Sequence, residues 1–140
     1  RTVGVSNYTI QHLEELVARS PVIPAVNQVE FSPFLYQKGL LEYCRRHGIQ
    51  LEAYSPLTRG QQFRHPIIAS LAAKYHKIPA QIMLRWALQH DVVVIPKSVN
   101  RQRIHENAQV FDFHLDEEDM LALDALNGDF RVSWDPSAVQ

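Results

Sequence analysis

Apolar and polar residues follow one another along this chain in blocks that predict strands and helices in strict succession. Four short apolar runs have the length of strands, and they lie at Thr2–Val5, Ala25–Glu30, Ile49–Tyr54 and Val92–Ile95. Elsewhere apolar residues recur at helical spacing. The helices that this spacing predicts are Ile10–Arg19, Gly39–His47, Ile67–Tyr75, Pro79–His90, Arg101–Val110 and a last one after Asp116. Strands and helices in this order predict a parallel sheet with right-handed crossovers.

Capping and turn residues mark the ends of the predicted helices. The expected N-caps are Thr9, Asn100 or Ser98, and Asp116, because their short polar side chains accept hydrogen bonds from free backbone N–H groups. Pro79 suits the first position of its helix. Gly48 and Gly128 are expected just beyond helix ends, since glycine adopts the left-handed conformation there without strain.

The run Val92–Ile95 shows no alternation, which predicts a strand that is buried on both faces of a parallel sheet. Pro96 ends the strand because it has no N–H group to donate. Lys97 and Ser98 follow at once, and Arg103 lies in the first turn of the next helix. Free N–H groups, the helix dipole and two basic side chains together make a candidate anion site. A plain buried strand followed by a solvated helix is the alternative.

Polar residues follow every predicted strand at its C-terminal end, where α/β proteins bind their ligands. They are Ser6 and Asn7, Gln28–Glu30, Tyr54 and Ser55, and Lys97 and Ser98. Four such units correspond to half of a (β/α)8 barrel, a fold of about 250 residues. An open doubly wound sheet is the rival, but the five glycines are isolated and form no Gly-rich phosphate-binding motif.

Composition narrows the class of protein. The 140 residues suffice for one domain, 46% are hydrophobic, and the net charge of −1 argues against nucleic acid as a partner. The single cysteine, Cys44, cannot form an internal disulfide, so we expect a core position and a reducing, cytoplasmic setting. No apolar run is long enough to span a membrane, and no signal peptide is visible. The seven histidines lack metal-ligand spacing, so we expect no metal site.

Four motifs in order resemble the aldo-keto reductases, and the resemblance covers essentially the whole chain. They are Gly4–Asn7, Asn27–Pro33, Ala53–Leu57 and Ile95–Val99, the last continuing through Arg103, Glu106 and Asn107. Their order and spacing match the second half of that barrel. The segment Phe130–Pro136 is most similar to the bacterial and plant diketogulonate-reductase-like members. The resemblance therefore implies that residues 1–140 are the C-terminal half-barrel of an NADPH-dependent oxidoreductase that reduces aldehydes or ketones to alcohols.

The resemblance also implies a role for each matching residue in binding NADP(H). Ser6, Asn7 and Gln28 match residues that hydrogen-bond the nicotinamide carboxamide, and Tyr54 matches the residue that stacks on the ring. The positions on the pyrophosphate side are Ser55 and Leu57; those around the 2′-phosphate are Lys97, Ser98, Val99, Asn100 and Arg103; those at the adenine are Glu106 and Asn107. A lysine and an arginine on a dianion favour NADPH over NADH.

Each residue taken alone also has a purely structural interpretation. Tyr54 could be an aromatic residue at a strand end, Asn7 a turn residue, and Glu106 a partner of Arg103 within one helix. Only the ordered set favours the cofactor interpretation.

The family's proton-donor set of Asp, Tyr, Lys and His belongs to the first half of its barrel, and no residue here matches it. Tyr54 and Lys97 match cofactor positions instead. We therefore expect no catalytic residue in this chain and no activity of the chain alone.

A half-barrel leaves two strand edges open, so we expect a homo-oligomer or association with the missing half. A non-catalytic, self-associating half-barrel that binds dinucleotide, or serves only as a folding unit, is the alternative. A third is a regulatory protein that senses the cofactor. We expect a small carbonyl substrate to bind only when the N-terminal half is supplied.

Overall fold

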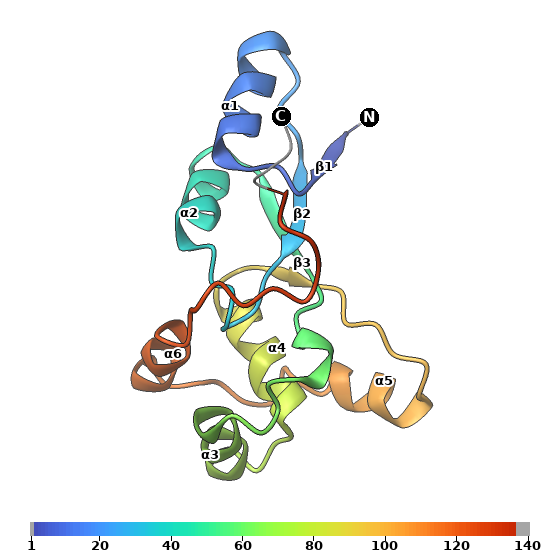
Figure 1. The fold of residues 1–140 in the computed structure, drawn as a ribbon. Coiled ribbons are helices and arrows are strands. Elements are labelled where there is room, and N and C mark those ends of the chain that lie inside the picture. The colour runs from blue at the N-terminus through green and yellow to red at the C-terminus, as the bar shows by residue number, and fades with distance from the viewer. Residues whose placement is uncertain (1, 137–140) are drawn as a thin grey trace.

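The computed structural model describes residues 2–136, and its centre is one parallel sheet (Figure 1). The strands are β1 (Gly4–Ser6), β2 (Val26–Glu30), β3 (Gln50–Tyr54) and β4 (Val93–Val94), and they lie side by side in the order β1-β2-β3-β4. Sequential strands are neighbours throughout, so the crossovers predicted from the sequence are confirmed. In the register, Ser6 lies opposite Gln28, and Glu52 lies between Gln28 and Val93.

Every strand is followed by at least one helix. The helices are α1 (Ile10–Arg19), α2 (Lys38–Arg46), α3 (Pro66–Lys74), α4 (Pro79–Gln89), α5 (Arg101–Ala108) and α6 (Glu117–Asp124), with a short 3-10 turn η1 (Thr58–Gly60) after β3. Figure 1 shows α1 and α2 on one side of β2 and β3, while the C-terminal segment after α6 crosses in front of these strands. The last four residues, and Arg1, lie outside the described range.

The core lies between the sheet and the helices. Asn27, Val29, Leu51 and Ala53 alternate along β2 and β3 on one face, and all four are buried. Cys44 of α2 is fully buried among them, as predicted. Trp86 of α4 is also fully buried; its indole N–H donates to the Asp124 carboxylate at 2.7 Å, so its polar atom is satisfied.

Most predicted helix ends are confirmed. The Thr9 hydroxyl accepts from the His12 N–H at 3.3 Å, the Asn100 side chain accepts from the Arg103 N–H at 3.1 Å, and Pro79 begins α4. Gly48, with φ +68°, follows α2 in the left-handed conformation. Two expectations were wrong. Asp116 stands at the N-cap of α6 without capping it, because its carboxylate pairs with Lys74 at 3.2 Å. Gly128 does not end α6, which stops at Asp124.

The expectation that Val92–Ile95 is buried on both faces was also wrong. Only Val93 and Val94 form strand β4, and burial alternates along the run. Val92 packs into the core, whereas Val93 and Ile95 are 43% and 41% exposed. Helices cover one face of the sheet. Over the other face the segment after α6 bonds to Glu30 at the end of β2, whereas the apolar side chains of β4 remain accessible.

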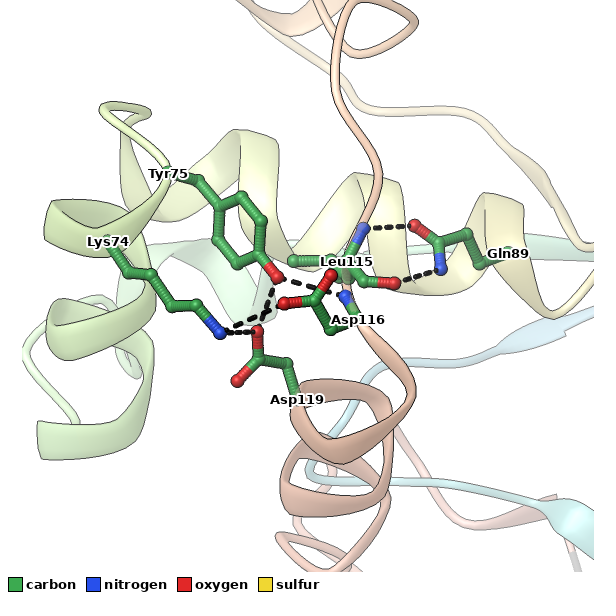
Figure 2. Close-up of polar contacts among 6 residues, drawn as sticks. All are labelled: Lys74, Tyr75, Gln89, Leu115, Asp116 and Asp119. Atoms are coloured by element: carbon green, nitrogen blue, oxygen red, sulfur yellow. Dashed lines mark hydrogen bonds and ion pairs between the residues drawn. The ribbon is translucent and has the colours of Figure 1, made fainter.

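The segment before α6 is fixed to α3 and α4 by polar contacts (Figure 2). The Lys74 ammonium lies 2.7 Å from Asp119, and the Tyr75 hydroxyl donates to the same carboxylate. On the other side, the Gln89 amide bonds both backbone groups of Leu115, at 2.7 and 3.0 Å. These contacts join α6 and the residues before it to α3 and α4. No helix in the described part of the chain is long and apolar enough to cross a membrane.

Candidate functional site

The turn after β1 is held in place by β2. The Asn7 N–H and the Ser6 hydroxyl both donate to the backbone carbonyl of Gln28, at 2.8 and 3.1 Å. The buried Asn27 amide bonds both backbone groups of Tyr8, at 2.9 and 3.3 Å. Asn7 has φ +59°, a left-handed conformation that asparagine tolerates better than most residues. Three residues of the predicted nicotinamide contact, Ser6, Asn7 and Gln28, are therefore linked to one another.

The side chain of Gln28 is itself held by β3. Its Nε2 donates to the Glu52 carboxylate at 2.5 Å, across the directly paired positions of the two strands. Tyr54 is two residues further along β3 and so projects from the same face of the sheet as Glu52. This face is the one that the helices do not cover.

A cavity of about 880 Å³ lies between the C-terminal ends of β3 and β4 and the start of α5. Its volume is within the range of small-molecule and cofactor sites. It is lined by the predicted residues Tyr54, Ser55, Leu57, Lys97, Ser98, Arg103, Glu106 and Asn107. Tyr54 and Lys97 are more than forty residues apart in the sequence, yet both line this cavity. They meet there because parallel strands end at the same edge of a sheet.

Positive charge gathers at this cavity. Lys97, Arg103 and Arg59 all line it, and the first turn of α5 adds the positive end of a helix dipole. Arg59 belongs to η1 and has φ +53°. Glu106 is the one carboxylate in the lining, and its Oε1 accepts from Gln102 at 2.7 Å. The cavity can therefore bind an anion beside the Tyr54 ring.

The remaining predicted residues lie outside this cavity. Ser6 and Asn7 line a second hollow of about 350 Å³, together with Trp134 and side chains of α1. Gln28 lines neither hollow and is joined to Ser6 on one side and Glu52 on the other. Val99 is 87% exposed, and the Asn100 side chain is engaged as the cap of α5. Gln28 therefore lies between Ser6, which lines the second hollow, and Glu52 of β3.

The segment after α6 is tethered over the end of β2. Both oxygens of Glu30, which is 2% exposed, accept backbone N–H groups, from Val132 at 2.6 Å and Ser133 at 3.0 Å. This tether holds the segment that carries Trp134 to the hollow at Ser6 and Asn7.

Sequence reasoning missed several residues of the site. Arg59 and Phe63 line the main cavity, and Glu52 holds the side chain of Gln28. Alternation within β3 was the available signal for Glu52, because a charged residue two positions before Tyr54 must share its face. Glu30 was expected among the polar residues at the end of its strand, but its partners could not be anticipated, since they lie 102 and 103 residues away.

Comparison with known sequences gives a consistent result. The sequence model described as "Aldo/keto reductase family" matches residues 1–65 and 62–128. The chain is 53% identical over 136 residues to a glyoxal reductase of Bacillus subtilis, and 52% identical to the uncharacterized oxidoreductase YtbE of the same organism. Each match covers 97% of this chain and 49% of the relative. The chain therefore spans about half the length of the curated relatives it matches.

Solved structures agree with this assignment. A mutant of Gox0644 in complex with NADPH superposes with a TM-score of 0.93 at 39% identity, over 99% of this chain and 52% of that one. An aldo-keto reductase of Bombyx mori in complex with NADP gives 0.87 at 37% identity, over 95% of this chain and 47% of that one. The predicted fold class is confirmed: the four parallel strands and their crossover helices form half of a (β/α)8 barrel. The chain belongs to the aldo-keto reductase family.

Proposed function

We propose that this chain is the NADPH-binding half of an oxidoreductase that reduces aldehydes or ketones to alcohols. The observation that carries the proposal is the cavity in which Tyr54, Lys97 and Arg103 meet. An aromatic ring, two cationic side chains and a helix start suit a ligand that combines a flat ring with phosphates. The NADPH and NADP complexes of two structural relatives support the same choice of cofactor.

The residues present fit the parts of such a dinucleotide. Ser6, Asn7 and Gln28 would bind the carboxamide, and Tyr54 would stack on the ring. The pyrophosphate would lie at Ser55 and Leu57. Lys97, Ser98, Val99, Asn100 and Arg103 would surround the 2′-phosphate, with Glu106 and Asn107 at the adenine. For Gln28, Val99 and Asn100 the proposal rests on the family resemblance, because none of them lines the cavity.

When bound, NADPH supplies the hydride for carbonyl reduction. The role of this chain is then to hold the ring and phosphates, so that one ring face is presented to the substrate. A proton must also reach the carbonyl oxygen, and the family's Asp, Tyr, Lys and His set has no counterpart among these residues. We propose that the chain is inactive alone and that residues 1–140 act as a single domain. A cytoplasmic setting belongs to the proposal, because Cys44 is a free thiol.

A second candidate is a non-catalytic half-barrel that binds dinucleotide and associates with itself. The observation that favours it is the accessible apolar surface at the edge of β4, where Val93 and Ile95 are 43% and 41% exposed. The same edge would accept the missing half of the barrel, so both functions require a partner at β4.

Titration of the chain with NADPH, followed by tryptophan fluorescence, tests the binding function. We expect saturable binding, and no reduction of an aldehyde such as methylglyoxal when only this chain is present. NADPH-dependent reduction by the purified chain would refute the claim of inactivity. Failure of a folded chain to bind NADPH would refute the proposed function itself.

A further inference from the structure

We propose that Glu52 is a positioning residue that fixes the orientation of the Gln28 amide and thereby selects a cofactor with an amide N–H on its ring. The inference rests on the proposed function, because it deepens the role of Gln28 in binding the carboxamide. Neither the sequence motifs nor the family comparison assigns a role to Glu52. The contact between these two side chains carries the inference.

Only one of the two orientations of the Gln28 amide is compatible with its contact to Glu52. An ionised carboxylate has only acceptor atoms, so the amide must turn its NH2 group, Nε2, toward Glu52. Nε2 of Gln28 and Oε1 of Glu52 lie 2.5 Å apart, in direct hydrogen-bonding contact. Gln28 Oε1 is then turned the other way and remains the acceptor of this side chain. Without Glu52, both amide orientations would be open.

The backbone around Gln28 leaves little room for the contact to shift. Gln28 and Glu52 are paired directly across β2 and β3, so their side chains leave the sheet on the same face and side by side. The Gln28 carbonyl is also bonded by the Ser6 hydroxyl and the Asn7 N–H. Both ends of Gln28 are therefore fixed, the backbone by β1 and the side chain by β3.

A fixed acceptor discriminates between ligands. A nicotinamide carboxamide donates an N–H to Gln28 Oε1, whereas an acetylpyridine ring carries a methyl group in that place and has no donor. An amide that can rotate would present its NH2 group to the acetyl oxygen instead and tolerate both ligands. The site selects the carboxamide because binding of the acetylpyridine ring would leave Gln28 Oε1 without a hydrogen-bond donor, which costs binding free energy.

The test compares the dissociation constants of NADPH and its reduced 3-acetylpyridine analogue for the unmutated chain and for Glu52→Gln. The introduced amide can either donate or accept, so Gln28 is no longer forced into one orientation. We expect the preference for NADPH to fall by roughly 3- to 10-fold in E52Q, the range of one neutral hydrogen bond. The preference for NADPH over NADH, which depends on the distant 2′-phosphate, should stay unchanged.

Two further variants separate positioning from a general structural effect. Glu42→Gln makes the same chemical change at an exposed site on α2, beside Lys38. It should change neither the preference for NADPH over the acetylpyridine analogue nor the preference for NADPH over NADH. In a Gln28→Leu background, E52Q should have no additional effect, because the group that it orients is gone. If E52Q does not fold, the side-chain amide resonances of Gln28 in the unmutated chain provide the test. The two NH2 protons should exchange with solvent at clearly different rates, because one of them is bonded to Glu52.

The outcomes are distinct. A reduced preference in E52Q that vanishes in the Gln28→Leu background supports the inference. NADPH binding with an unchanged preference between the two ring types in E52Q overturns the inference and leaves the proposed function standing. Equal rates of solvent exchange for the two Gln28 NH2 protons overturn it as well. No NADPH binding by the folded, unmutated chain overturns the proposed function, and the inference falls with it.

Discussion

The Glu30 carboxylate at the end of β2 accepts a 2.6 Å hydrogen bond from the backbone N–H of Val132, 102 residues further along the chain. The second oxygen accepts from Ser133 at 3.0 Å. A carboxylate that is 2% exposed is costly to bury unless it is bonded in this way. The contact therefore connects the C-terminal end of β2 to the segment after α6, at the edge of the sheet where the candidate site lies.

Replacing Glu30 with glutamine should release the segment after α6. The new NH2 group cannot accept a hydrogen bond, so one backbone N–H loses its partner, at a cost of about 1–3 kcal/mol. Limited trypsin digestion measures the effect, because cleavage after Arg131 requires the segment to detach. We expect cleavage several-fold faster in E30Q and unchanged in Glu118→Gln, an exposed change on α6. Equal rates in all three chains would show that Glu30 does not hold the segment.

The Asp119 carboxylate should contribute more to stability than its neighbour Asp116. Both contact Lys74, but Asp119 is 8% exposed and also accepts from the Tyr75 hydroxyl, whereas the Asp116 side chain is 66% exposed (Figure 2). We expect Asp119→Asn to lower the free energy of unfolding by about 1–3 kcal/mol. Asp116→Asn should cost under about 1 kcal/mol. Urea denaturation at neutral pH measures both, and the reverse order would contradict this explanation.

The contribution of Asp119 should also disappear in acid. Burial alone would raise the pKa of this carboxyl, but the hydrogen bonds from Lys74 and Tyr75 outweigh it and hold the pKa below its ordinary value of 3.8. A carboxyl whose pKa is lower in the folded state stabilises the fold above the unfolded value and loses this effect as the pH falls through the folded value. The difference in stability between the unmutated chain and D119N should therefore shrink below about pH 4. A difference that stays constant with pH would exclude the ionised carboxylate as its source.

The accessible face of β4 should drive association of the chain. Val93 lies opposite Glu52 in the register, on the face without helices, and β4 is the last strand of the sheet. We expect light scattering to give at least a dimer mass. Val93→Lys should lower that mass, because a charge at an open strand edge opposes pairing. Leu121→Lys, at a 62% exposed position on α6, is the matched control. A monomer that melts cooperatively would rule out this role for the edge.

The sequence was sufficient to predict the features that depend on local pattern. The strand and helix order, the caps at Thr9 and Asn100 and the left-handed Gly48 follow from residues close together in the chain. The convergence of Tyr54, Lys97 and Arg103 also followed, because strands in a parallel sheet end at one edge.

Features that depend on distant partners could not be predicted in this way. Asp116 has the residue type and position of a cap, but Lys74, 42 residues away, binds its carboxylate instead. The apolar run at β4 looks buried on both faces because it carries the pattern of a closed barrel, whereas this chain covers one face only. Glu30 looked like an ordinary polar residue at a strand end, since its partners come from the segment after α6.

The central claim is that the cavity at β3, β4 and α5 binds NADPH through its 2′-phosphate. The most direct measurement is the ratio of NADH to NADPH dissociation constants for the unmutated chain, Arg103→Ala and Arg101→Ala. Arg103 lines the cavity, and Arg101 is exposed at the start of the same helix, outside the lining. We predict a ratio of about 10 or more in the unmutated chain and in R101A, as one or two charge-assisted hydrogen bonds give, and a ratio near one in R103A. Equal affinities for the two cofactors in the unmutated chain would contradict the account.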